Sequence, residues 1–300
     1  MQICETMKRM ARRSKKDAVE EWKLAAVSFL LLMCFTLLVY YRTFSSMKLY
    51  IDDKDPYSYV AIIPPMFLIT LIFFYRTDLK VGRDSKKLLL SLPFFAVSAI
   101  LLFEAGAFPN YALDMLSIPF FTAGAVLLFF SIYTMKRLLP PILYLFLLWT
   151  PLFQPLASTQ QSLTNFTSDI VAIPITLSGL AIERYGNVFN SQTQGFMEVV
   201  PECVSLSSII ALFCFLLPFA YAAKGNAINK VVWLALWLIM TWVLDVLRIL
   251  IVLLIWYNAG VSSALQAFHS LGWNMLFDFI LIAALASITF FKLFGIDLRL

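Results

Sequence analysis

The chain has 300 residues, of which 61% are apolar and only 14% are charged. Because about a quarter of the residues in an average soluble domain are charged, this composition excludes an ordinary soluble protein and indicates a polytopic membrane protein. The net charge of +5 is therefore interpreted as a topology signal and not as evidence for a nucleic-acid partner.

The N-terminal segment 1–23 contains seven Lys and Arg residues and precedes the first long apolar run. No small-residue cleavage site follows that run, so we expect a retained helix and not a cleaved signal peptide. This first apolar run and the apolar runs that follow it predict an all-α protein with about eight transmembrane helices. The expected spans are 24–41, 59–75, 88–103, 115–133, 138–156, 203–222, 231–256 and 270–291.

The distribution of Lys and Arg between these spans predicts their orientation. Eighteen of these residues fall on the N-terminal side of the membrane and four on the other side. The positive-inside rule then places the N- and C-termini in the cytoplasm. We expect the basic segment 1–23 to be followed by a single membrane domain, 24–300.

The long polar segment 157–202 falls on the outer face in this topology. Its moderately apolar part, 162–181, would reverse the charge bias of all later segments if it crossed the membrane. We therefore expect an interfacial or re-entrant helix there, followed by the candidate catalytic helices within 203–291.

Three reactive or charged residues fall at one predicted depth near the outer face. Cys203 stands at the mouth of the sixth span, and His269, the only His of the chain, at the mouth of the eighth. Arg248 lies about 25 Å from the inner end of the seventh span, from a rise of 1.5 Å per residue. Their common depth makes them a candidate site.

Each of the three also has a simpler structural explanation. Taken alone, Cys203 is better explained as a small buried residue at a helix start, and His269 equally well as an interfacial side chain that reaches water. An Arg inside a span is a functional candidate by default. Asp245 lies three residues before Arg248, so the two could instead form a structural ion pair on one helix face.

The three residue types together suit acyl transfer at a peptide bond. A thiolate is a nucleophile, and a nearby cation or base favours its formation. Arg248 could stabilise the thiolate or an oxyanion, and His269 could transfer the proton. Glu202 is better explained as a loop carboxylate near a helix N-terminus than as part of this chemistry. With one His and no C-x-x-C spacing, the sequence predicts neither a metal site nor a cofactor.

These residues resemble the exosortase/archaeosortase family. The resemblance rests on Cys203 opening the sixth span, on "DVLRILIV" with Arg248 and on "FHSLGW" with His269. It covers about 200–275 and the eight-span architecture, and the short length favours an archaeosortase-like member.

The resemblance implies a membrane cysteine protease or transpeptidase that cleaves C-terminal sorting signals of surface proteins. Its implied partners are proteins ending in a short motif, a transmembrane helix and a basic tail, with a membrane lipid as acceptor and no nucleic acid. By match, Cys203 is the nucleophile that forms an acyl-thioester, Arg248 stabilises the thiolate or oxyanion, and His269 is the general acid and base. The implied location is the cell membrane, with the active site near the extracytoplasmic face.

The sequence departs from this family at two places. Asp245 stands where the family often has Asn, and its charge would weaken the positive potential of Arg248. Val204 and Ser205 follow Cys203 where the family often has a small residue. A transporter that uses the buried Arg and Asp, a non-catalytic membrane scaffold and a lipid-linked glycan transferase remain as alternatives.

Overall fold

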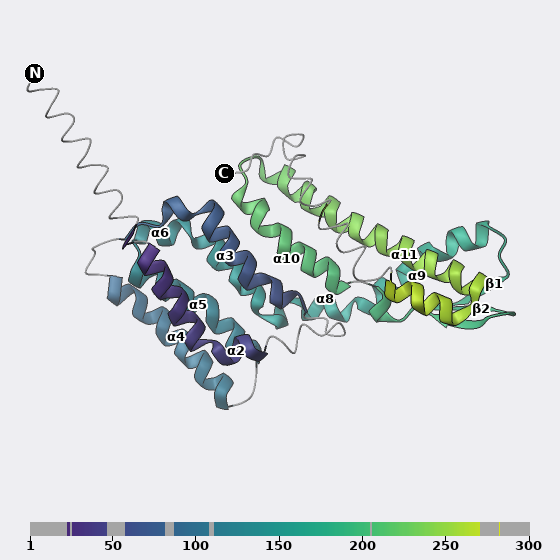
Figure 1. The fold of residues 1–300 in the computed structure, drawn as a ribbon, viewed down its shortest axis with the longest axis horizontal. Coiled ribbons are helices and arrows are strands. Elements are labelled where there is room, and N and C mark those ends of the chain that lie inside the picture. The colour runs from purple at the N-terminus through teal and green to yellow at the C-terminus, as the bar shows by residue number, and fades with distance from the viewer. Residues whose placement is uncertain are drawn as a thin grey trace, which may run out of the picture. The chain divides into compact units, whose positions relative to one another are not determined.

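The computed structural model describes residues 23–24, 26–46, 58–81, 87–107, 111–204, 206–270 and 282. This part of the chain is mostly helical (Figure 1), as the sequence predicts. Each of the first seven expected spans coincides with helical structure. The eighth, 270–291, lies almost entirely outside the described residues.

The helices differ in whether they are long enough to cross a membrane. Among the described residues three are long and apolar enough, Lys87–Gly106, Ala112–Phe129 and Ala227–Phe268. The two short pieces Leu139–Leu148 and Thr150–Ser158 make a fourth if they are counted as one broken span. The apolar helices Ala26–Val39, Tyr59–Phe74 and Leu206–Ala222 are shorter. A membrane location follows from these helices, whereas eight spans and their orientation stay predictions.

The contacts of the chain group into two compact units, and the first includes residues 63–149 and the N-terminal helix. Here Tyr40 donates or accepts hydrogen bonds with Ser98 and Ser117, at 2.9 and 2.8 Å. Such hydroxyl contacts are a usual way to join helices in a membrane. Besides Ala26–Val39, the elements are α2 (Tyr41–Ser46), α3 (Ile63–Phe74), η3 (Arg76–Asp78), α4 (Lys87–Ala107), α5 (Tyr111–Phe129), α6 (Ile132–Arg137), α7 (Leu139–Tyr144) and η4 (Leu145–Leu148).

The second unit includes residues 150–270 and the short turn η2 (Ser58–Ile62), and it contains all the candidate site residues. One core joins α9 (Gln160–Leu177) to α11 (Ala227–Ser270), through Val171, Val252 and Trp256 among others. Its further elements are η5 (Thr150–Phe153), α8 (Gln154–Ser158), α9 (Gln160–Leu177), β1 (Ile182–Tyr185), β2 (Val188–Ser191), β3 (Gly195–Glu198), η6 (Pro201–Cys203), α10 (Leu206–Ala222) and α11 (Ala227–Ser270).

The all-α prediction is wrong in one place, because the segment 157–202 contains a small β-sheet. Its expected helix is present as α9, but the residues after it form a three-stranded antiparallel sheet in the order β1-β2-β3. Gly186, in the turn after β1, and Gly195, the first residue of β3, have φ values of 65° and 79°, a conformation that Gly adopts without a steric penalty. Phe189 on β2 is 1% exposed and packs into the core of this unit, so the sheet buries apolar surface that a solvated loop would expose.

Helix α11 reverses its direction at Gly260, where φ is 83° and ψ is 175°. Figure 1 shows its yellow C-terminal part folded back along the preceding helix. Ala264 accordingly packs in one core with Ile249 and Leu253. The stretch 257–269, which none of the expected spans covered, therefore contains the turn and the second arm of a helical hairpin. His269 lies in the last turn of that hairpin.

Candidate functional site

Cys203 lies in the 3-10 turn η6 and not in the helix that follows it. The extended Val200 (φ −77°, ψ 158°) leads into Pro201, and the Cys203 amide donates to the Val200 carbonyl at 2.8 Å. Proline suits the first position of such a turn, because it has no N–H and its φ is fixed. Helix α10 begins only at Leu206. The expectation that Cys203 opens the helix is therefore wrong by one short turn, and its side chain is partly exposed.

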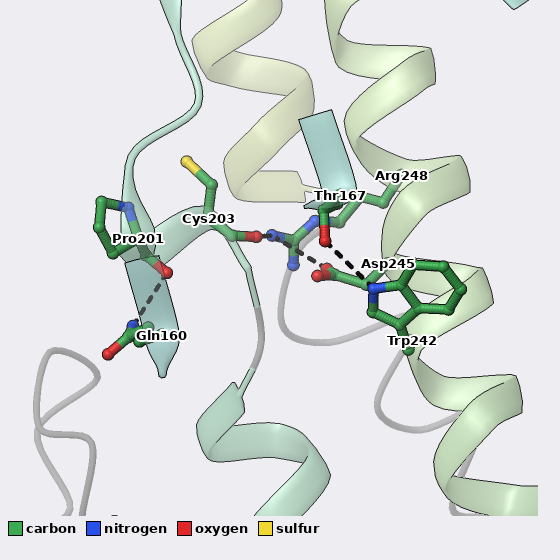
Figure 2. Close-up of polar contacts among 7 residues, drawn as sticks. All are labelled: Gln160, Thr167, Pro201, Cys203, Trp242, Asp245 and Arg248. Carbon is green, nitrogen blue, oxygen red and sulfur yellow. Dashed lines mark hydrogen bonds and ion pairs between the residues drawn. The ribbon is translucent and has the colours of Figure 1, made fainter. Parts of the chain in front are cut away.

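Arg248 of α11 reaches this turn from the buried interior of the unit. Its side chain is only 6% exposed, and its Nη2 donates to the backbone carbonyl of Cys203 at 2.7 Å. Figure 2 shows the Cys203 sulfur directed away from the guanidinium. The structure thus brings together the Cys and the Arg that the sequence placed at one depth. In this arrangement the Arg holds the backbone of the Cys and not its thiol.

Asp245 balances the charge of Arg248. Its Oδ1 lies 3.4 Å from Arg248 Nη2, and its side chain is 3% exposed. The i, i+3 ion pair that the sequence indicated is therefore present. Its length exceeds that of an ordinary N–H···O hydrogen bond, so charge contributes more to the pair than a directed bond does. Two charges this deeply buried are tolerated only when they are paired.

Phe268 packs against the guanidinium of Arg248. Its ring centre lies 4.9 Å from Arg248 Cζ, within the range of a cation–π contact. In a straight helix, twenty residues would separate the two by about 30 Å, so the contact depends on the reversal at Gly260. His269 is the next residue after Phe268. Its side chain, like that of Glu202, lies outside the described residues, and its role stays a prediction.

One donor of Arg248 is not used by the part of the chain that the structure describes. Its Nε is buried and has no hydrogen-bond partner among those residues. A buried donor without an acceptor costs about 1–3 kcal/mol, and such groups occur where a site awaits a ligand or a water molecule. The guanidinium is thus held through Nη2, while the Nε–H can still donate a hydrogen bond.

Two contacts of α9 at this site were not predicted from the sequence. Gln160 Nε2 donates to the Pro201 carbonyl at 2.9 Å, and Trp242 Nε1 donates to Thr167 Oγ1 at 3.1 Å. Both are drawn in Figure 2. No local signal could have found them, because each joins residues more than forty positions apart. Among the described residues, no group of three or more His, Cys, Asp or Glu could hold a metal ion.

A helical membrane protein with a partly exposed Cys beside a buried Arg is the class that this fold and site define. The family model of the transmembrane exosortases matches residues 51–288, and the chain belongs to that family. The resemblance found in the sequence is thereby confirmed. No curated protein and no solved structure matches the chain.

Proposed function

We propose that the protein is a membrane cysteine protease and transpeptidase that cleaves the C-terminal sorting signals of surface proteins. The observation that carries this proposal is the direct bond from the buried Arg248 to the backbone of Cys203, in a chain of the exosortase family. Family membership supports the processing of sorting signals. The particular residues, the transfer step and the extracytoplasmic position of the site are our proposal.

The proposed reaction begins when His269 takes the proton of the Cys203 thiol, which leaves a thiolate. Its sulfur attacks the carbonyl carbon of the scissile peptide bond, and the carbonyl oxygen becomes an oxyanion that Arg248 stabilises. The C–N bond then breaks, His269 protonates the leaving amine, and the substrate remains on Cys203 as a thioester. Attack on the thioester by a hydroxyl or amine of a lipid acceptor, or by water, releases the product and restores the thiol.

The geometry of the site is compatible with these reaction steps once the Cys203 side chain has rotated. The sulfur is directed away from the guanidinium (Figure 2), and rotation about the Cα–Cβ bond of Cys203 changes its direction. The bond to the carbonyl keeps the backbone next to Arg248 during that rotation. The substrate in this proposal is a protein with a short C-terminal motif, a transmembrane helix and a basic tail.

The proposal is tested by replacing Cys203 with Ala and with Ser in cells that produce candidate surface proteins. We expect both variants to accumulate precursors that keep their C-terminal signals, because neither has a thiolate. The matched control is Cys214→Ala, which removes a buried Cys of α10 outside the proposed site, and should process normally. Normal processing by a stably produced Cys203→Ala protein would overturn the proposal and favour a transporter or a scaffold.

A further inference from the structure

The short turn η6, which carries Cys203, accepts hydrogen bonds from side chains of two helices, α9 and α11. On one side Arg248 of α11 donates to the Cys203 carbonyl at 2.7 Å. On the other side Gln160, the first residue of α9, donates to the Pro201 carbonyl at 2.9 Å. Figure 2 shows the two contacts at opposite ends of η6. The backbone position of Cys203 is therefore fixed from two directions.

The helix that bears Gln160 is itself attached to α11. Trp242 donates to Thr167 at 3.1 Å, and its ring stacks on Phe166 with centroids 5.4 Å apart. Further along α9, Val171 and Ile175 are buried in the core that they share with α11. Because α9 cannot slide along α11 without breaking these contacts, Gln160 is presented to the turn from a fixed position.

The Pro201 carbonyl has a second donor besides Gln160. The Val204 amide also donates to it, at 3.1 Å, and closes the 3-10 turn. Loss of the Gln160 donor would therefore not leave the Pro201 carbonyl unpaired, and the penalty for an unsatisfied buried group would not arise there. What would be lost is the connection between α9 and the turn.

We propose that Gln160 is a positioning residue, whose hydrogen bond to Pro201 sets the place of the Cys203 thiol in the reaction. This inference rests on the proposed function, in which the thiol must lie next to the scissile carbonyl. A displacement of about 1 Å in a reacting group can lower a rate by about two orders of magnitude. Gln160 acts through the backbone of the turn and does not itself contact the reacting atoms.

The test compares Gln160→Met with Gln161→Met. Methionine matches glutamine in length but has no donor, so the first variant removes only the hydrogen bond. Gln161 is the next residue of α9, is exposed and donates to Asn165 at 3.2 Å, so its replacement is the matched control. Both changes are made in the full chain with Cys4, Cys34 and Cys214 replaced by Ala, which leaves Cys203 as the only thiol.

Two measurements are made on each protein in proteoliposomes. The first is the rate at which a membrane-impermeant maleimide alkylates Cys203. The second gives kcat and KM for a precursor that accumulates in the Cys203→Ala strain. We expect Gln160→Met to lower kcat about tenfold or more while KM stays within about twofold, because only the position of the thiol changes. Its alkylation rate should change about threefold or more, and Gln161→Met should equal the parent in both measurements.

The possible results distinguish a failure of the positioning role of Gln160 from a failure of the proposed function. An unchanged kcat, a change in KM alone, an unchanged alkylation rate or an equal loss in Gln161→Met would each overturn the positioning role. If Gln160→Met accumulates poorly, Gln160→Glu takes its place, since an ionised carboxylate of the same length also cannot donate. Continued processing by Cys203→Ala would instead refute the proposed function, and the alkylation rates would still report whether Gln160 holds the turn.

Discussion

The reversal of α11 at Gly260 gives the sharpest prediction about the fold of the site. Its φ of 83° and ψ of 175° lie in a region that essentially only glycine adopts, and any other residue there costs about 1–3 kcal/mol. A Cβ at this position would meet Gln194 Oε1 at 3.4 Å, which is an ordinary contact. The expected destabilisation by Gly260→Ala is therefore about 1–3 kcal/mol and comes from the backbone alone.

The reversal also determines a contact of Arg248, so the substitution should affect function as well as stability. With a straightened helix, Phe268 would move from 4.9 Å to about 30 Å from the guanidinium. We expect Gly260→Ala to lower the thermal unfolding midpoint in detergent and to slow precursor processing.

The matched control for this substitution is Gly106→Ala in α4. A Cβ at Gly106 meets nothing within 4 Å, and its φ is not positive. Alanine is favoured over glycine in a helix by about 1 kcal/mol, so this variant should be neutral or slightly more stable. A Gly260→Ala protein with the stability and activity of the parent would refute the reasoning.

Two further predictions concern the contacts around Arg248 and α9. Replacing Asp245 by Asn should raise the alkylation rate of Cys203 at neutral pH about threefold or more. The reason is that the positive charge of Arg248, no longer balanced by Asp245, favours the thiolate. An unchanged or slower rate would show that the Asp245–Arg248 pair does not control the thiol. Trp242→Phe keeps the ring contact with Phe166 but loses the 3.1 Å bond to Thr167. It should lower stability by about 1 kcal/mol and the unfolding midpoint by about 2 °C, and an unchanged midpoint would contradict the role of this bond in holding α9.

The helices could be predicted from the sequence because a membrane leaves the backbone few alternatives. Without water to bond to, N–H and C=O groups in hydrocarbon must bond to each other, so a long apolar run such as 88–103 becomes a helix. The small sheet was missed because strands of four residues give little periodic signal. A local signal was nevertheless present, since Gly186-Asn187 separates Tyr185 from the apolar pair Val188-Phe189, a pattern typical of a hairpin.

The candidate site could be predicted in part, because helix rise converts sequence position into membrane depth. That argument brought Cys203 and Arg248 to one level, and the structure places them in direct contact. It could not specify that the Arg binds the carbonyl and not the thiol, because side-chain direction depends on packing among distant elements. The reversal at Gly260 was missed because a single glycine in "NAGVSS" is compatible with a loop, a kink or an undisturbed helix.

Two nitrogens of the Arg248 guanidinium, Nη2 and Nε, have different surroundings, and this difference bears on the proposed chemistry. Nη2 is occupied by the Cys203 carbonyl and lies near Asp245, so it stabilises the resting structure. Nε is buried without an acceptor among the described residues, and a buried donor left without any acceptor costs about 1–3 kcal/mol. A substrate carbonyl that bonded to Nε would remove this cost, and it would bond more strongly as its oxygen became negative. In the proposed reaction, the same guanidinium would hold the Cys203 turn through one nitrogen and stabilise the transition state through another.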